Sequence, residues 1–259
     1  MSKEIIQILR KKMITASYYA KEGHIASALS VLDILYVLYE KVLNINSNNL
    51  HSPNRDYLIL SKGHASLAHA VILELKKFIS EDQFKSYCSF DSILGGHLNR
   101  KKVPGVESST GSLGHGIGVS IGIAMSSKIQ NKKNRIFVIV GDGEANEGTF
   151  WESLLLASHH KLDNLCCIVD YNHSNDRALK LDPLYEKLKS FGWHTRIMNG
   201  HSHLEIKDNV QLSSVNKPLA IIANTVKGKG VKRMENNHEW HHKYPNKEEY
   251  ESIIKELSQ

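Results

Sequence analysis

The stretch Ile136-Phe137-Val138-Ile139-Val140 runs straight into the turn Gly141-Asp142-Gly143. Five consecutive apolar residues that are mostly β-branched and end at a glycine indicate a buried strand. A second apolar run, residues 165–170, leads to Asn172, and an amphipathic helical stretch separates the two runs. A strand–helix–strand unit of this kind makes its strands parallel, so their carboxyl ends meet at one edge of a sheet. We therefore expect Asp142 and Asn172 to lie close together.

The oxygen atoms of these two side chains suit a small, hard cation. Magnesium prefers carboxylate, amide and phosphate oxygens, and a cation bound here would hold a diphosphate against the Gly143 backbone. Other phosphate motifs fail in this turn. Asn146 stands where the Gly-x-Gly-x-x-Gly pattern needs its third glycine, and Thr149 stands where a Walker loop needs its lysine. The Gly-Asp-Gly tripeptide alone is equally compatible with a plain strand-to-helix turn.

The rest of the chain alternates strand and helix patterns. We expect strands at 57–60, 136–140, 165–170, 193–197 and 219–226, and helices at 4–20, 31–42, 65–77, 113–128, 150–161 and 183–190. This alternation predicts an α/β fold with a mostly parallel sheet and helices on both faces. No linker or repeat interrupts the pattern, so we expect one domain over residues 1–259.

Two local features refine this prediction. Thr149 and Glu152 have the spacing of a capping box, which places a helix start directly after the Gly-Asp-Gly turn. The segment 86–112 is irregular and rich in glycine and serine. It is longer than ordinary connections, which indicates a functional loop.

Composition narrows the class of protein. The net charge is +6, but the basic residues are dispersed and aromatic residues do not interleave with them. A nucleic-acid surface needs such a platform, so an anionic small molecule is the expected partner. No apolar run approaches the roughly 20 residues needed to cross a bilayer. Three cysteines without a disulfide or zinc spacing fit a cytoplasmic protein.

Several histidines occupy glycine-flanked positions. His24, His64 and His97 each follow a glycine. A single such histidine is commonly structural, but three of them suggest imidazoles that move protons or donate to a ligand. The glycine-rich loop Ser109–Gly118 allows two interpretations: close packing of a helix, or backbone that passes close to a flat ligand.

The segment His238-Glu239-Trp240-His241-His242 formally matches the zinc-protease pattern His-Glu-x-x-His. That motif requires the middle of a helix. Asn236-Asn237 precedes this segment and Tyr244-Pro245 follows it, so we expect a loop or a single turn and keep a zinc hydrolase only as a remote alternative.

Together these blocks resemble the amino-terminal, diphosphate-binding segment of transketolases, especially the type made as two chains. The resemblance extends from about residue 10 to about residue 250. Its ordered blocks are Gly23-His24, Leu60–Ser66, Val103–Glu107, Thr110–Gly114, Gly141–Glu144, Lys161–Leu165, Phe191–Trp193, Thr225–Gly230, Met234–Asn237 and Trp240-His241.

The resemblance implies a thiamine diphosphate-binding fold, with thiamine diphosphate and Mg2+ (or Ca2+ or Mn2+) as cofactors. Asp142, Asn172 and the carbonyl of Ser174 match the metal ligands of the family. Residues around the cofactor are matched by His64, Gly111, Ser112, Leu113, Gly143, Asn172 and His241. Histidines that handle substrate hydroxyls and protons are matched by His24, His97 and His241.

The resemblance further implies a transferase that moves a two-carbon ketol unit from a ketose to an aldose or its phosphate. In the family, a glutamate on a pyrimidine-binding domain activates the cofactor, and this chain does not contain that domain. We therefore expect a partner, a carboxyl-terminal transketolase subunit that supplies this glutamate, and a heterotetramer of two chains of each type.

This chain departs from the family pattern at Ile25-Ala26-Ser27, His173, Ser174 and His242. Two alternatives therefore stay open beside a transketolase. One is a related carboligase or decarboxylase that acts on an unusual sugar or keto acid. The other is a non-catalytic assembly subunit.

Overall fold

A five-stranded parallel sheet forms the centre of the computed structural model, which describes residues 2–212 and 216–258. The strand order is β1-β2-β3-β5-β4, and every neighbouring pair is parallel. The strands are β1 (Tyr57–Leu60), β2 (Ile136–Gly141), β3 (Leu165–Tyr171), β4 (His194–Asn199) and β5 (Leu219–Asn224). The predicted α/β fold is confirmed, and β2 and β3 are direct neighbours as expected.

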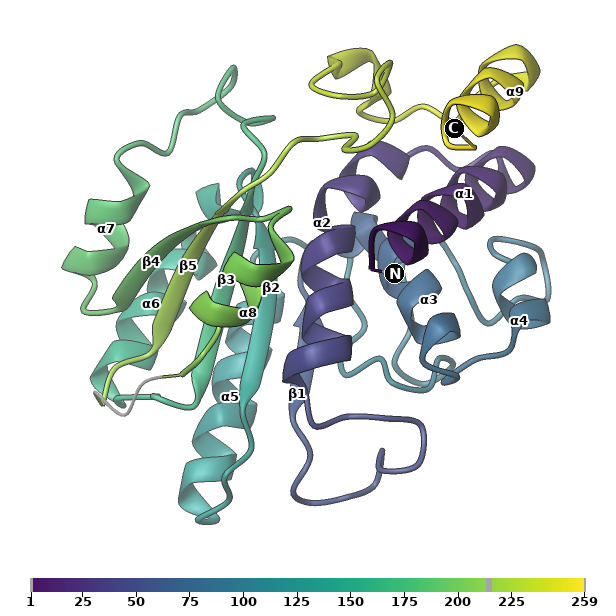
Figure 1. Cartoon of the computed structure of the whole chain (residues 1–259). Helices are drawn as coiled ribbons and strands as arrows, with labels where there is room; N and C mark the ends of the chain where they lie inside the picture. Colours follow the sequence, from purple (N-terminus) through teal and green to yellow (C-terminus); the bar gives the residue numbers. More distant parts are fainter. Residues whose placement is uncertain (1, 213–215, 259) are drawn as a thin grey trace.

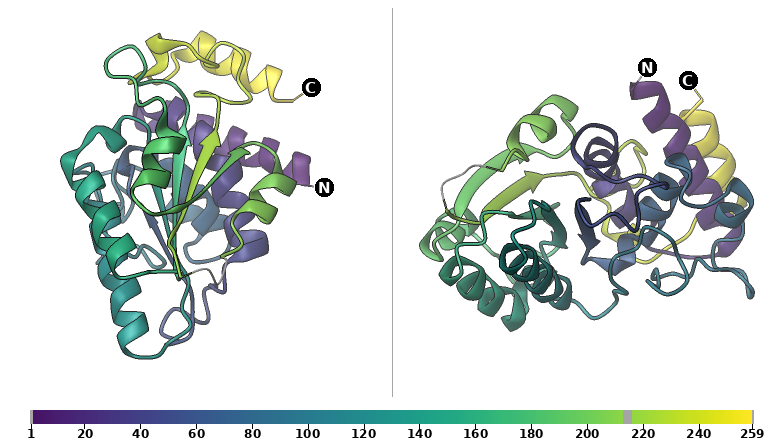
Figure 2. Two further views of the ribbon diagram at one scale, coloured as in Figure 1. Left: turned by 90° about the vertical axis from the view of Figure 1, so that its left-hand side faces the viewer. Right: turned by 90° about the horizontal axis from the view of Figure 1, so that it is seen from below.

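Helices cover both faces of the sheet because its side chains alternate between two cores. Phe137 and Ile139 join one core, whereas Val138 and Val140 join the other. Figure 1 and Figure 2 show the resulting layers. The first core is closed by α1 (Ser2–Ala20), α2 (Ile25–Val37), α3 (Ser66–Leu75) and α8 (His203–Asn209), and the second by α5 (His115–Ile129), α6 (Gly148–His159) and α7 (Leu184–Ser190).

Some helices were not predicted or begin elsewhere. The helix expected at 31–42 begins at Ile25 and ends in a π-helical turn, η1 (Leu38–Val42). All residues of α2 are buried, so no polar face marks its first turn. The helices α4 (Glu81–Lys85), α8 and α9 (Lys247–Glu256) were not predicted. Their N-cap residues Ser80, Ser202 and Asn246 accept hydrogen bonds from the first turn, which was the available sequence signal.

The capping box expected at Thr149 is wrong. Helix α6 begins at Gly148 after the short 3-10 turn η3 (Glu144–Asn146), and no side chain caps it. A Cβ placed on Gly114 would lie 2.4 Å from the Thr149 hydroxyl oxygen. The hydroxyl therefore packs against the Gly114 backbone of a distant loop, and its position was set by tertiary packing.

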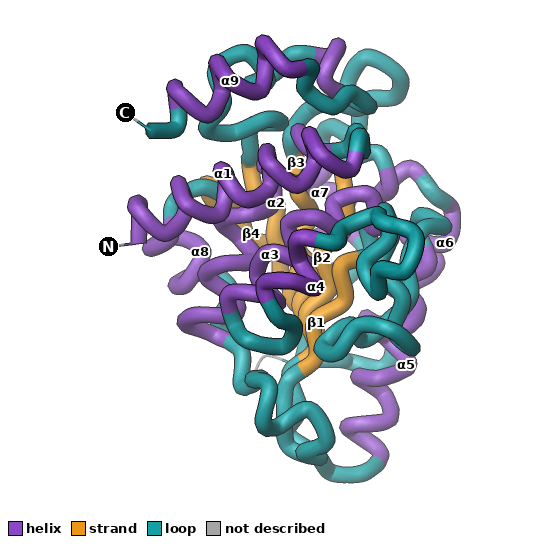
Figure 3. Tube along the Cα trace, turned by 90° about the vertical axis from the view of Figure 1, so that its right-hand side faces the viewer, coloured by secondary structure: helices purple, strands orange, loops and turns teal. Residues whose placement is uncertain are grey.

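The carboxyl ends of the strands meet segments from both ends of the chain. After β5 the chain passes over the sheet to the 3-10 turn η4 (His238–Trp240) and then to α9, which packs beside α1 (Figure 1, Figure 3). Tyr250 of α9 stacks on Tyr18 of α1 with ring centroids 4.3 Å apart. None of the helices described is both long and apolar enough to span a membrane.

Candidate active site

A cavity of about 350 Å3 opens at the carboxyl ends of the strands. It collects residues from the turns after β1, β2, β3 and β5 and from the amino end of α2. Among the predicted site residues, Ser112 is exposed and does not line the cavity. The others do: His24, His64, His97, Gly111, Leu113, Asp142, Gly143, Asn172, Ser174 and His241.

Asp142 and Asn172 face the same end of this cavity, with Ser174 between them. The Ser174 amide donates to Asn172 Oδ1 at 3.1 Å, and the Ser174 hydroxyl lies 3.4 Å from Asp142 Oδ1. The Gly143 amide donates to the same Asp142 oxygen at 2.8 Å. Adjacent parallel strands thus bring the two side chains together, as expected from the order of the elements.

The second oxygen of Asp142 has no partner. Its Oδ2 atom is buried and accepts no hydrogen bond from any residue that the structure describes. Burial raises the pKa of this carboxyl group above its ordinary value, and the Lys62 ammonium only partly opposes that shift. A buried carboxylate oxygen without a donor is costly. A cation at this position would remove the cost, so Asp142, Asn172 and Ser174 fit a hard metal ion.

Beneath this pair lies a buried ion pair. Lys62 and Asp170 are almost completely inaccessible, and their Nζ and Oδ2 atoms are 2.5 Å apart. Ser30 donates to the same Asp170 oxygen at 2.6 Å, and Thr225 donates to the other. Burial alone would raise the pKa of Asp170, but Lys62 and these hydroxyl donors hold it below its ordinary value.

Glu144 ties three segments of the cavity wall together. Its Oε1 accepts from the Ser61 hydroxyl and from the Gly114 amide at 2.9 Å, and its Oε2 accepts from the Gly141 amide at 3.1 Å. The side chain is buried. It therefore fixes the turns after β1 and β2 against the glycine-rich loop.

Basic groups concentrate on one side of the cavity. Lys227 Nζ lies 2.9 Å from His241 Nδ1, and burial, followed by repulsion from Lys62, lowers the pKa of Lys227 to about 8. Burial and the same two lysines, together with His24 and His97, lower the pKa of His64 to about 2, so this imidazole stays neutral. The concentration of positive charge favours an anionic ligand.

The opposite side of the cavity carries His24 and His97. His24 lies at the start of α2, with its ring centroid 5.5 Å from that of His64. Burial lowers the pKa of His24, so it is neutral at pH 7 and can accept a proton. His97 is exposed at the rim of the cavity.

Both interpretations of the glycine-rich loop hold, at different residues. A Cβ on Gly116 would lie 2.5 Å from Ser61 Cβ, so this glycine permits close helix packing. Gly111, in contrast, lines the cavity beside His97. Here the backbone is left open toward whatever the cavity holds.

Sequence reasoning missed four charged residues of this site. Lys62, Glu144, Asp170 and Lys227 were not among the predicted site residues, although each stands within or beside a quoted block. For Asp170 a signal existed, because a carboxylate within a fully buried strand requires partners. The partners themselves come from distant segments.

The His238–His242 segment forms only the single 3-10 turn η4, as predicted. His241 lines the cavity beside Lys227, whereas His238 does not. The segment therefore lacks the helical face that a zinc protease needs, and that alternative is rejected.

Comparison with known proteins agrees with this geometry. Residues 1–257 match the family described as transketolase, thiamine diphosphate binding domain. The chain belongs to the transketolase family. The predicted family membership, the transketolase-type transferase class and thiamine diphosphate as cofactor are thus confirmed, and the chain is a subunit of a thiamine diphosphate-dependent transketolase.

Some relatives have nearly the same length as this transketolase chain. One of the two subunits of an apulose-4-phosphate transketolase from Phocaeicola vulgatus is 36% identical over 96% of this chain and 91% of its own length. A 6-deoxy-6-sulfo-D-fructose transketolase subunit from a Clostridium species is 32% identical over 91% of this chain and 88% of its own length.

Other relatives are much longer. The structure of transketolase from Leishmania mexicana superposes with a TM-score of 0.91 at 23% identity, covering 100% of this chain and 41% of that chain. This likeness shows the shared fold. The chain therefore spans about two fifths of the length of that solved transketolase.

Proposed function

We propose that this chain is the cofactor-binding subunit of a two-chain transketolase, which transfers a two-carbon ketol unit from a ketose to an aldose or aldose phosphate. The observation that carries this proposal is the unpartnered oxygen of Asp142, buried beside Asn172 and Ser174 at the edge of a basic cavity. Such an arrangement suits a metal ion that holds a diphosphate.

In this proposal Asp142, Asn172 Oδ1 and the Ser174 carbonyl bind Mg2+, for which Ca2+ or Mn2+ could substitute. The Gly143 backbone, His64 and His241 surround the diphosphate, and Lys227 adds the positive charge that a diphosphate favours. The segment Gly111-Ser112-Leu113 lies against the pyrimidine ring.

Thiamine diphosphate supplies an electron sink for the carbon–carbon bond that is broken and formed. The protein positions the sugar and moves protons. His24, which is neutral at pH 7, accepts a proton from a substrate hydroxyl, while His97 and His241 donate to the sugar oxygens. Lys227 lies against His241 Nδ1, so the proton of the neutral His241 ring resides on Nε2.

A partner subunit completes the site. The relatives of matching length are named as subunits of transketolases, which supports a carboxyl-terminal partner with the pyrimidine-binding domain and its activating glutamate. We propose that residues 1–259 form one domain, that two chains of each type assemble into a heterotetramer, and that the substrates are sugars or sugar phosphates.

Reconstitution tests the proposal. We expect ketol transfer only when the chain, its co-purified partner, thiamine diphosphate and Mg2+ are combined. Asp142→Ala should lose Mg2+-dependent cofactor binding in calorimetry and lose activity in the same assay. Sustained transfer by this chain alone, or unchanged cofactor affinity of Asp142→Ala, contradicts the proposal.

The choice of donors in this assay separates the remaining alternatives. Ketoses and their phosphates should support turnover in the complete enzyme. Turnover with keto acids in place of ketoses would instead identify the related carboligase or decarboxylase. Absence of cofactor binding even with the partner present would identify a non-catalytic assembly subunit.

A further inference from the structure

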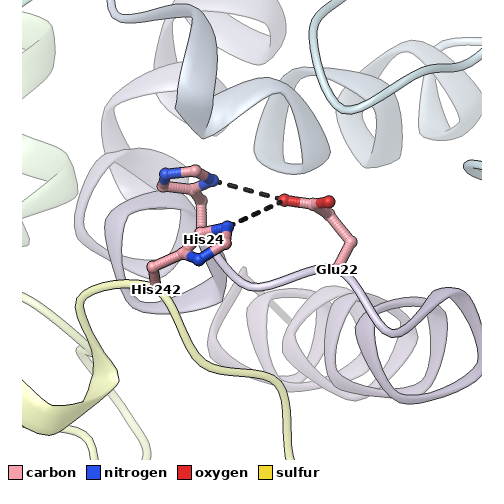
Figure 4. A group of neighbouring side chains, drawn as sticks. All are labelled: Glu22, His24 and His242. Carbon is pink, nitrogen blue, oxygen red and sulfur yellow. Dashed lines mark hydrogen bonds and ion pairs between the residues drawn. The ribbon is translucent and has the colours of Figure 1, made fainter.

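A second group of potential metal ligands lies at the rim of the cavity. Glu22, His24 and His242 point their polar atoms toward one another (Figure 4). Glu22 Oε1 is 3.3 Å from His24 Nδ1 and 4.0 Å from His242 Nε2. One ligand atom from each of the three residues lies within 4.8 Å of the other two.

The backbone brings these residues together from opposite ends of the chain. Glu22 and His24 flank Gly23 between α1 and α2, whereas His242 follows η4. A Cβ on Gly23 would lie 2.9 Å from both the His242 carbonyl carbon and its ring. The absence of a side chain at Gly23 therefore allows the two segments to touch.

The Glu22 carboxylate is fixed from its other side. A Cβ on Gly96 would lie 3.6 Å from Glu22 Cδ, so the loop before His97 packs against this group. His242 is the mobile member of the three, because its side chain is 65% exposed. It can rotate toward the other two without disturbing the core.

The donor set has the chemistry of a zinc site. Two imidazoles and one carboxylate form a known three-residue zinc set that leaves the fourth position open. Ligand atoms about 2.1 Å from a tetrahedral zinc ion lie roughly 3.4 Å apart. The Glu22–His24 separation already matches this value, and a small rotation of His242 closes the remaining gap.

We propose that Glu22, His24 and His242 bind Zn2+ at the rim of the cavity. This site differs from the Asp142 site in its ligands, because imidazole nitrogens select zinc over magnesium, whereas an all-oxygen set favours magnesium. Zinc bound here occupies His24 Nδ1 and narrows the path to the cofactor. The predicted consequence, which rests on the proposed function, is that Zn2+ inhibits ketol transfer reversibly.

Binding is tested first, on the whole chain in excess Mg2+ so that the oxygen site is filled. Titration with Zn2+ against a chromophoric chelator should show one zinc per chain, and Co2+ should give the absorption of a tetrahedral site. His242→Asn and Glu22→Gln should each weaken zinc binding at least about tenfold, as loss of a ligand requires.

His238→Asn is the matched control, because His238 is an exposed histidine four residues from His242 in the same segment. It should bind zinc like the wild type. Equal affinity of His242→Asn and the wild type, or equal loss in His238→Asn, overturns the zinc site. Circular dichroism of each variant shows whether folding is intact, and the exposure of His242 predicts that it is.

Activity is tested second, in the two-chain enzyme. Zn2+ should inhibit the wild type, a chelator should restore activity, and His242→Asn should resist inhibition. Zinc binding without inhibition overturns the regulatory consequence. If the two-chain enzyme transfers no ketol unit at all, the proposed function fails, while the binding titration still decides the metal site.

Discussion

At the scale of single residues, the buried pair Lys62–Asp170 organises the floor of the cavity. Taking both charges out of water is costly, and the pair is tolerated because Ser30 and Thr225 also donate to Asp170. Asn172, whose amide nitrogen is 3.5 Å from the same carboxylate, is oriented by this network. The position of a proposed metal ligand therefore depends on charges beneath it.

Replacement of Lys62 tests this dependence. Lys62→Met should lower the free energy of unfolding by about 3–5 kcal/mol, since it leaves a buried carboxylate without its partner. Urea denaturation at pH 7 measures the change. The double variant Lys62→Met, Asp170→Asn removes both charges and should recover a large part of the loss. A loss below about 1 kcal/mol in the single variant would show that the pair is not structurally important.

Lys227 gives a pH-dependent prediction. The pKa of its side chain is about 8 in the folded chain against an ordinary value of 10.5. Between these values the unfolded chain binds more protons than the folded chain, so this residue makes stability rise with pH. Below pH 8 the buried ammonium is a standing cost that does not change with pH.

The measurement is the free energy of unfolding of the wild type and of Lys227→Met from pH 7 to pH 10. The wild type should gain on the variant by up to about 1 kcal/mol per pH unit above pH 8. Parallel profiles for the two proteins would contradict the lowered pKa.

At the scale of elements, the turns after β1 and the loop that ends at α5 form one wall of the cavity. Gly63 is the point where they meet, because a Cβ there would lie 2.6 Å from Thr110 Oγ1 and 2.9 Å from His97 Cδ2. The long irregular segment 86–112 is thus positioned by close contact with the turn that carries His64.

Gly63→Ala should push this loop away from the cavity. We expect a loss of about 1–3 kcal/mol in stability from overpacking, and a lower affinity for thiamine diphosphate in calorimetry. Gly122→Ala is the control, because a Cβ at Gly122 of α5 meets no atom within 4 Å. It should gain about 0.5–1 kcal/mol as a helix-interior alanine. Equal effects of the two substitutions would refute the steric argument.

At the scale of the whole molecule, the two ends of the chain meet above the sheet. Stacking of Tyr250 on Tyr18, and the 3.2 Å contact of the Tyr250 hydroxyl with Thr15 Oγ1, fix α9 on α1. The segment between β5 and α9 carries Lys227, His241 and His242. Docking of α9 therefore limits the motion of one side of the site.

Tyr250→Ala should loosen this segment. We expect a loss of about 1–2 kcal/mol from the lost stacking and burial, with faster amide hydrogen exchange over residues 231–246. Tyr244→Ala, which removes a 42% exposed side chain from the same region, should change stability by less than about 0.5 kcal/mol. Unchanged exchange in Tyr250→Ala would mean that α9 does not restrain the site.

The sequence by itself determined the sheet and the positions of Asp142 and Asn172. Runs such as Ile136–Val140 encode burial and strand length locally, and the order strand–helix–strand makes β2 and β3 parallel neighbours. The family resemblance then added the histidines and the glycine-rich loop, and all but Ser112 of those predicted residues line the cavity.

Only the tertiary structure decided which charged groups meet. Lys62 and Asp170 are 108 residues apart, and no local pattern announces their contact. The same holds for Thr149, whose hydroxyl packs against Gly114, and for His242, which reaches Glu22 across Gly23. Local periodicity reports which face of an element is buried, whereas the partner on that face is chosen by the packing of distant segments.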